Sequence, residues 1–171
     1  MKKTIAILGS SRRNGNTGKM IDSIAECLDI EVIDLNNLNI SGYDYEHKNI
    51  DDDFLATIKH VLSHDHIIFA SPVYWYSMSA QMKIFFDRIS SLLSIDELKP
   101  IGRRFREKTA YLVTTSASEQ ADQSFIEVFN KTFAYLGMHS QGFVHAYCEN
   151  DYQARHHQHA ISAFTRKISS E

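Results

Sequence analysis

Short apolar runs alternate with longer amphipathic stretches along the chain of 171 residues. The apolar runs are rich in β-branched residues and are bounded by polar turns, as is typical of strands covered on both faces. We therefore expect five buried strands, of which the second has the weakest pattern. The runs cover residues 4–8, 31–35, 66–70, 109–115 and 141–147.

The stretches that follow these runs repeat apolar residues at intervals of three and four, which predicts amphipathic helices packed on a core. Gly137 is suited to end the fourth helix, because glycine readily takes the left-handed conformation that closes a helix. Two polar stretches, 36–53 and 94–108, are expected to be irregular. The helical stripes cover residues 20–28, 54–62, 82–93, 125–136 and 160–168.

This alternation of strands and helices predicts an α/β fold: a three-layer, doubly wound sandwich around a five-stranded parallel sheet. The chain length suits the flavodoxin-like strand order 2-1-3-4-5. Because no repeat or linker interrupts the pattern, we expect residues 1–171 to form a single domain. Sheets of this kind bind ligands at the carboxyl ends of their strands, near the switch point between strands 1 and 3.

Charge and hydropathy exclude several classes of protein. Lysine and arginine number 18 and aspartate and glutamate 21, so the formal net charge is −3. Proteins that bind nucleic acid by neutralising phosphates are usually basic, so we expect no nucleic-acid partner. No apolar run approaches the roughly 20 residues that span a bilayer, and no secretory signal pattern is present. We therefore expect a cytoplasmic protein with no membrane partner.

The two cysteines, Cys27 and Cys148, fit neither a zinc site nor a CxxC motif, so a reduced compartment is the simplest interpretation. Cys27 continues a helical stripe and is expected to be buried, whereas Cys148 follows a strand and is expected to be exposed. Nine histidines invite a metal interpretation. No carboxylate or cysteine completes a set with metal-ligand spacing, so we predict no metal site.

The loop after the first strand, residues 9–18, combines small hydroxyl and amide residues with glycines and two arginines. Asn16 or Thr17 can cap the following helix, whose free N–H groups and dipole would attract an anion. Arg12 can add a charge-assisted bond to a phosphate. The loop fits neither a Walker A motif nor the G-x-G-x-x-G fingerprint of dinucleotide-binding domains. The alternative is a capped polar turn without a ligand.

Three consecutive aromatic residues, Tyr74 to Tyr76, follow Pro72 at the end of the third strand. Aromatic side chains at this edge of a sheet can stack on a flat ring or enclose it. Ser77 or Ser79 can start the next helix. The alternative is that the aromatic residues cover an apolar edge or a contact between subunits.

Together the two loops resemble the flavodoxin-like NAD(P)H-dependent FMN reductases and NAD(P)H quinone reductases. GSSRRNGNT is similar to the family's G-S-x-R-x-x-G-N-T loop, and SPVYWYSMSAQMKIFFDR is similar to its P-[VI]-Y-x-x-x-[MI]-[ST]-[AG]-x-[LM]-K segment. The resemblance implies that FMN is bound and that NADPH or NADH is the hydride donor. The loop after the fourth strand departs from the family, because it contains serines where glycines are usual.

The resemblance also implies the residues of the site. Ser10, Arg12, Asn16 and Thr17 would hold the FMN phosphate, and residues 72–76 would line the isoalloxazine. The flavin carries the chemistry in this family, so we assign no catalytic side chain. The full set of candidate cofactor-binding residues is Ser10, Arg12, Asn14, Gly15, Asn16, Thr17, Pro72, Val73, Tyr74, Trp75, Tyr76, Ser77, Thr115 and Ser116.

The expected function is therefore an FMN-dependent NAD(P)H oxidoreductase that passes electrons to a flavin, a quinone or a similar small acceptor. The alternatives are a flavodoxin-type electron carrier, against which the modest charge argues, and a flavin-binding protein without turnover. The resemblance implies a homodimer or homotetramer, with Tyr74–Tyr76 and Tyr43–Tyr45 as candidate contacts. Arg103, Arg104 and Arg106 either bind the 2′-phosphate of NADPH or form a solvated loop before a strand.

Overall fold

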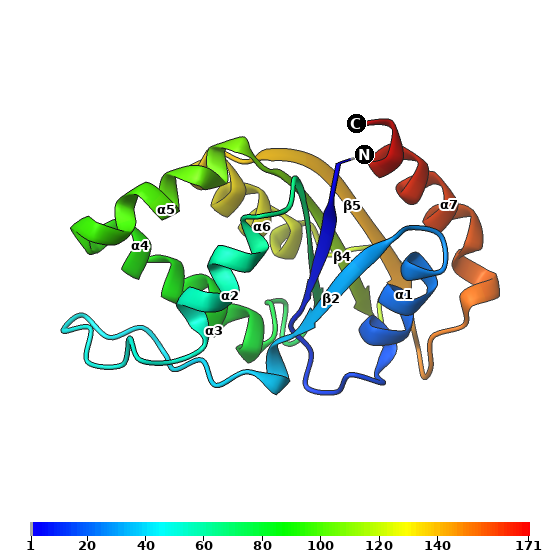
Figure 1. Ribbon diagram of the computed structural model, residues 1–171. Helices are drawn as coiled ribbons and strands as arrows, with labels where there is room; N and C mark the ends of the chain where they lie inside the picture. The colour runs from blue at the N-terminus through cyan, green and yellow to red at the C-terminus, as the bar shows by residue number, and fades with distance from the viewer. Residues whose placement is uncertain (1) are drawn as a thin grey trace.

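The computed structural model describes residues 2–171 and places five parallel strands in one sheet, in the order β2-β1-β3-β4-β5 (Figure 1). This order is the predicted one, and it is that of flavodoxin-like proteins. It puts the first strand beside the third, where the order reverses. The strands are β1 (Thr4–Leu8), β2 (Ile30–Asp34), β3 (His66–Pro72), β4 (Thr109–Ser116) and β5 (His139–Tyr147).

Helices cover both faces of the sheet, as predicted. In Figure 1, α1 and α7 lie on one side of the strands, and α2, α3 and α6 lie on the other. The principal helices are α1 (Asn16–Ala25), α2 (Phe54–Val61), α3 (Ala80–Ile89), α6 (Gln123–Leu136) and α7 (Ala154–Ser170). Two short helices, α4 (Ser91–Ser94) and α5 (Lys99–Arg103), lie between α3 and β4.

Strands β1, β3 and β4 each supply side chains to two separate cores, because successive residues of a strand point to opposite faces. In β1, Ile5 and Ile7 join the core under α2, α3 and α6, whereas Ala6 and Leu8 join the core under α1 and α7. All four side chains are fully buried. Burial on both faces explains why the strand reads as a continuous apolar run rather than an alternating one.

Several element boundaries differ from the prediction. Strand β3 extends two residues further, to Pro72, which pairs with Thr115 at the end of β4. Strand β2 ends at Asp34, whose carboxylate accepts a hydrogen bond from the Asn36 N–H and starts a short 3₁₀ turn. The third apolar stripe is divided between α3 and α4 at Ser90. The fourth helix ends at Gly137 in the left-handed conformation, as predicted.

Both expectations about cysteine exposure were wrong. Helix α1 ends at Ala25, so Cys27 lies beyond the buried stripe and is exposed. Cys148 is 5% exposed, because its N–H donates to the carbonyl of Ser116 and holds it beside the end of β4. Burial, with the nearby charge of Asp151, raises the pKa of the Cys148 thiol to about 11.

A buried ion pair fastens the irregular segment 36–53 to α3. The Arg88 guanidinium forms two hydrogen bonds with the Asp52 carboxylate and a third, of 3.1 Å, with the Ser41 carbonyl. The two side chains are 1% and 3% exposed, and the Arg88 guanidinium lies 4.8 Å from the centre of the Phe54 ring. Burial alone raises the pKa of Asp52, but the bonds from Arg88 and from the N–H groups of Ser41 and Phe54 outweigh it and lower that pKa.

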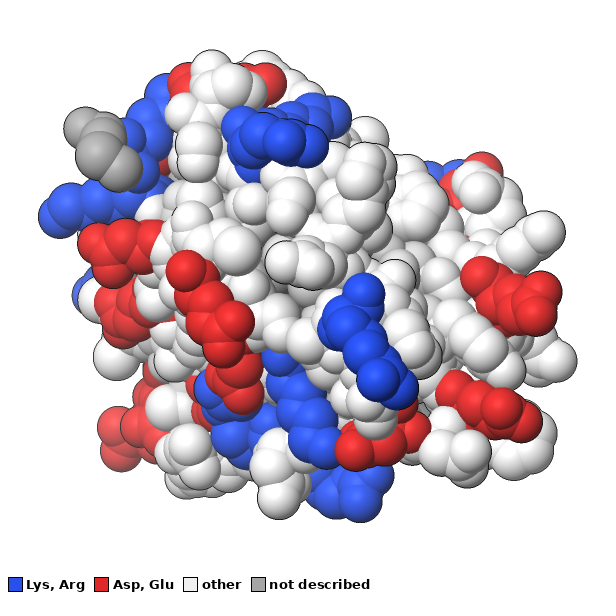
Figure 2. Space-filling view, turned by 90° about the vertical axis from the view of Figure 1, so that its right-hand side faces the viewer, with Lys and Arg blue, Asp and Glu red and all other residues white. Residues whose placement is uncertain are grey.

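The surface over α1 and α7 carries charges of both signs. Figure 2 shows acidic and basic side chains interspersed among uncharged residues on this side of the molecule. Between residues 2 and 171, no helix is both long enough and apolar enough to cross a bilayer.

Candidate functional site

A pocket of about 160 Å³ opens at the carboxyl ends of β1, β3 and β4. It lies at the reversal of the strand order, where this class of sheet binds ligands. The loops after the three strands each contribute to its wall. The lining residues are Ser10, Arg12, Gly15, Asn16, Thr17, Pro72, Val73, Tyr74, Thr115, Ser116, Ala117 and Cys148. Of the predicted residues, only Asn14, Trp75, Tyr76 and Ser77 are outside this wall.

The loop after β1 is shaped by short-range hydrogen bonds and by one glycine. The Gly15 N–H donates to the Arg12 carbonyl at 3.2 Å, and the Ser10 hydroxyl donates to the same oxygen at 3.2 Å. At Gly18, an added Cβ would lie 1.7 Å from the Arg13 carbonyl oxygen, so no larger residue fits this path of the chain. The loop therefore wraps closely around the start of α1.

Neither Asn16 nor Thr17 caps α1, contrary to prediction. Gly15 is the capping residue and offers no side-chain hydrogen bond. The Asn16 side chain instead accepts from the Tyr152 N–H at 3.0 Å, and the Thr17 hydroxyl pairs with that of Thr115 at 2.8 Å. The backbone N–H groups of Asn16 and Thr17 have no acceptor among the described residues. The helix therefore presents free donors and its positive dipole end at the pocket.

The two adjacent arginines of this loop have different surroundings. The Arg13 guanidinium binds the Asp22 carboxylate, with a shortest distance of 2.5 Å, and donates to the Gly18 carbonyl at 3.4 Å. The hydrogen bond to Asp22 raises the pKa of Arg13. Arg12 is exposed at the pocket and forms no salt bridge within residues 2–171. Only Arg12 is therefore available to a ligand without breaking an existing ion pair.

The aromatic residues after β3 form a tight turn with an unusual backbone. Tyr74 and Ser77 exchange two backbone hydrogen bonds, of 2.9 and 3.0 Å, around Trp75 and Tyr76. These two central residues have φ angles of +50° and +61°. Left-handed backbone at bulky residues costs on the order of 1–3 kcal/mol per residue, and such strain concentrates at functional sites. The Trp75 side chain is 94% exposed and that of Tyr76 is 73% exposed.

Ser79, rather than Ser77, starts α3. Its hydroxyl accepts from the Met82 N–H at 3.2 Å and donates to the Gly9 carbonyl at 2.6 Å. Its own N–H donates to the buried hydroxyl of Ser71. An added Cβ at Gly9 would lie 2.8 Å from that of Met82, so this strand and helix are in close contact. These contacts fix the aromatic turn against the loop after β1.

The last two residues of β4 contribute hydroxyl groups that already have partners. Thr115 pairs with Thr17, and the Ser116 hydroxyl lies 2.8 Å from Nε2 of His145. Burial, with the charge of His157, lowers the pKa of His145. The imidazole is therefore neutral at pH 7, and its hydrogen bond orients Ser116 at the edge of the pocket.

The arginine cluster is separate from this pocket. Arg103, Arg104 and Arg106 precede the amino end of β4, whereas the pocket lies at the carboxyl end of that strand. The Arg104 guanidinium donates to the Leu62 carbonyl at 2.8 Å. Arg103 ends α5, and Arg104 and Arg106 lie in the 3₁₀ turn that follows it, where all three residues are exposed.

The structure also assembles a group that the sequence analysis missed. Glu31, His60 and His64 come from β2, α2 and the loop before β3, and their ligating atoms lie within 4.8 Å of one another. The sequence analysis looked for a carboxylate at metal-ligand spacing along the chain, and this group has no such spacing. The separation of Glu31 from His60 along the chain hides the group from any spacing rule, and only the sheet topology reveals it.

The fold and the pocket define a flavodoxin-like protein in which the loop after β1 lies beside an exposed aromatic turn. The profile of the family described as NADPH-dependent FMN reductase matches residues 2–168. The chain belongs to this family, as its two loops led us to expect.

Individual relatives agree with this assignment. The chain is 28% identical over 150 residues to the Bacillus subtilis protein named "Putative NAD(P)H-dependent FMN-containing oxidoreductase YwqN", with 83% of each chain covered. It is similar to a solved Bacillus subtilis protein described as Trp repressor binding protein, with 25% identity, a TM-score of 0.76, and coverage of 96% of this chain and 98% of the other. An FMN-dependent NADH-azoreductase from Bacillus anthracis, solved with FMN, shares the fold at 13% identity, a TM-score of 0.73 and 98% coverage of both chains.

Proposed function

We propose that this protein binds FMN at the pocket between the loops after β1, β3 and β4 and reduces it with NADPH or NADH. The electrons then pass to a small acceptor such as a flavin or a quinone. One observation carries the proposal: free anion-binding donors and a strained, exposed aromatic turn border the same pocket. The first suits a phosphate and the second suits a flat ring, which are the two ends of FMN.

The start of α1 would hold the phosphate end. The N–H groups of Asn16 and Thr17 would donate to the phosphate oxygens, and the Arg12 guanidinium would add a charge-assisted bond. Ser10 orders the loop through its bonds to Arg12. The pocket is smaller than the roughly 300–1,000 Å³ typical of drug-sized ligands, so only the phosphate end and part of the chain fit inside it.

The ring end would lie at the mouth of the pocket, against the aromatic turn. Tyr74 lines the wall, and the N–H groups of Trp75 and Tyr76 have no acceptor in the part of the chain that the structure describes. These N–H groups suit the carbonyl and nitrogen edge of a flavin. Bound FMN would supply the chemistry of electron transfer from a nicotinamide to the acceptor. The protein's contribution is to position the ring and leave one side open to flat reactants.

The remaining expectations are part of the same proposal. We propose that residues 1–171 act as one FMN-binding domain in the cytoplasm and that the protein forms a homodimer or homotetramer. Exposed aromatic side chains support the last point: Trp75 is 94% exposed and Tyr45 is 87% exposed, as subunit contacts would be in an isolated chain. A solution mass equal to one chain would contradict the oligomer.

Titration of the protein with FMN, followed by the quenching of flavin fluorescence, tests the assignment of the phosphate end. Arg12→Ala is expected to raise the dissociation constant of FMN roughly 10- to 150-fold, which corresponds to about 1.5–3 kcal/mol for a charge-assisted bond. Arg103→Ala removes the same charge at the opposite end of the sheet and should leave the dissociation constant unchanged. Equal affinities for the two variants would show that the phosphate binds elsewhere.

A further inference from the structure

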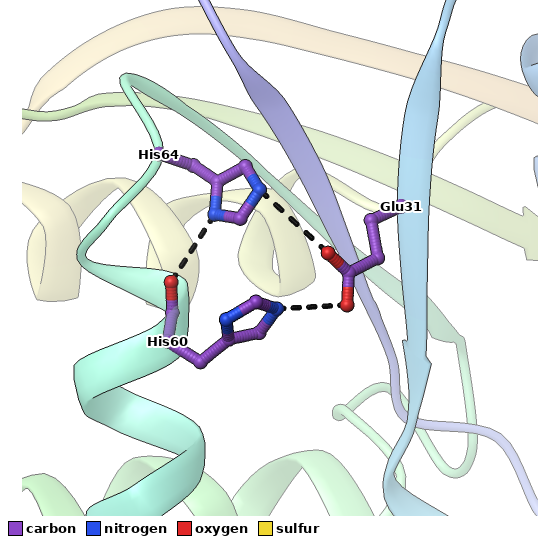
Figure 3. Close-up of side chains that lie close together, drawn as sticks. All are labelled: Glu31, His60 and His64. Carbon is purple, nitrogen blue, oxygen red and sulfur yellow. Dashed lines mark hydrogen bonds and ion pairs between the residues drawn. The ribbon is translucent and has the colours of Figure 1, made fainter.

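Glu31, His60 and His64 converge at the end of the sheet opposite the pocket (Figure 3). Glu31 is the second residue of β2, and His60 lies in the last turn of α2. Nε2 of His60 is 2.8 Å from one oxygen of the Glu31 carboxylate, and Nε2 of His64 is 3.8 Å from the other. Figure 3 shows both imidazole rings turned toward the same carboxylate from one side of β2.

The orientation of His64 is set by its other ring nitrogen. Nδ1 lies 3.1 Å from the His60 carbonyl oxygen, to which it can only donate. A proton on Nδ1 leaves the lone pair of a neutral imidazole on Nε2, which faces the carboxylate. Metal-ligating histidines commonly have this arrangement, in which a backbone carbonyl fixes the tautomer and the direction of the ring. The His64 side chain is only 10% exposed and is therefore already ordered.

We propose that Glu31, His60 and His64 bind a divalent transition-metal ion of the Zn²⁺ class. Two imidazole nitrogens and one carboxylate oxygen form a donor set that such ions favour, and a water molecule would complete a tetrahedron. The proposal is independent of FMN binding, because the cofactor pocket lies at the other end of the strands.

Small side-chain movements are sufficient to form the site. Metal–ligand bonds of about 2.0–2.2 Å place tetrahedral ligand atoms roughly 3.3–3.6 Å apart. The ligand atoms here are within 4.8 Å of one another, and the Glu31 and His60 side chains are half exposed, so they can adjust. Lys2 and Lys3 line the adjacent pocket together with Asp29. The positive charges of the two lysines would repel a metal ion and the negative charge of Asp29 would attract it. The affinity must therefore come from the bonds to the three ligands.

Zinc titration of the full-length protein by calorimetry, after dialysis against a chelator, tests the proposal. We expect one Zn²⁺ per chain and a higher melting temperature with zinc, because the metal would link α2 to the edge strand β2. His64→Gln and Glu31→Gln should each weaken binding at least tenfold, and Glu31→Gln preserves the shape of the side chain if the histidine variant folds poorly. Co²⁺ substitution should give the intense visible bands of a tetrahedral site.

His159→Gln is the matched control, because it removes an exposed histidine from the histidine-rich start of α7. It should leave zinc affinity and the rise in melting temperature unchanged. The absence of zinc binding by the unaltered protein would overturn the proposal. So would zinc binding that survives Glu31→Gln and His64→Gln but is lost in His159→Gln, since the metal would then lie on α7. Either result would overturn the metal site alone, because the affinity for FMN is measured separately at the other end of the sheet.

Discussion

Replacing Arg88 by methionine should destabilise the protein far more than removing an exposed charge from the same helix. Arg88 and Asp52 are 1% and 3% exposed, so the change leaves an ionised carboxylate buried without its partner. Breaking a buried pair on one side typically costs about 3–5 kcal/mol. At roughly 2–4 °C per kcal/mol for a domain of this size, the melting temperature should fall by about 6–20 °C.

Lys83→Met is the control for this experiment. Lys83 also lies in α3 and pairs with Asp87 at 2.6 Å, but the two side chains are 57% and 46% exposed. Exposed pairs of this kind contribute roughly 0.5 kcal/mol or less, so the melting temperature should change by no more than about 2 °C. Equal losses of melting temperature in Arg88→Met and Lys83→Met would refute the argument from burial.

The pH dependence of the same pair has a definite sign. The pKa of Asp52 is lowered in the folded protein, so its contribution to stability is present above the ordinary aspartate pKa and is lost as the pH falls through the lowered pKa. In Arg88→Met the buried carboxylate loses its partner and protonates more readily. The difference in melting temperature between this variant and the unaltered protein should therefore shrink from pH 7 toward pH 4. A gap that widens on acidification would contradict the assignment.

Two further predictions concern the pocket. In Gly18→Ala the added Cβ would lie 1.7 Å from the Arg13 carbonyl oxygen, so the loop must move. The affinity for FMN, measured by fluorescence, should therefore fall at least tenfold. Gly42→Ala is the control, because its Cβ would meet nothing within 4 Å and should leave the affinity unchanged. At pH 8 a thiol reagent should modify exposed Cys27 rapidly and Cys148 slowly, because Cys148 is buried and has a pKa of about 11, and FMN should slow Cys148 further. Two equally fast thiols would contradict the burial of Cys148.

The fold could be predicted because the local and the global signals agree. Continuous β-branched runs such as residues 4–8 are compatible with a strand covered on both faces, and the chain alternates them with helical stripes of suitable length. Gly137 marks a helix end that only a left-handed residue closes well. One boundary moved even though the pattern was strong: strand β3 extends beyond its apolar run through Pro72, because its last residues still pair with β4.

The site was only partly predictable. The composition of the loops indicated a phosphate and a flat ring, and most of the indicated residues line one pocket. The sequence did not reveal the left-handed backbone of Trp75 and Tyr76, because neither residue type favours that conformation. Cys148 and the group of Glu31, His60 and His64 depend on contacts between distant segments. Such contacts follow from the topology of the sheet and leave no pattern in the neighbouring sequence.

The central claim, that the protein binds FMN and reduces it with a nicotinamide, is tested most directly by one spectrum. The protein is loaded with FMN, freed of excess cofactor and mixed anaerobically with NADPH and, separately, with NADH. The account predicts that the visible flavin band bleaches promptly with at least one donor and returns when a quinone is added. A bound flavin that neither donor bleaches would favour an electron carrier or a flavin-binding protein without turnover, and failure to retain any flavin would contradict the cofactor assignment itself.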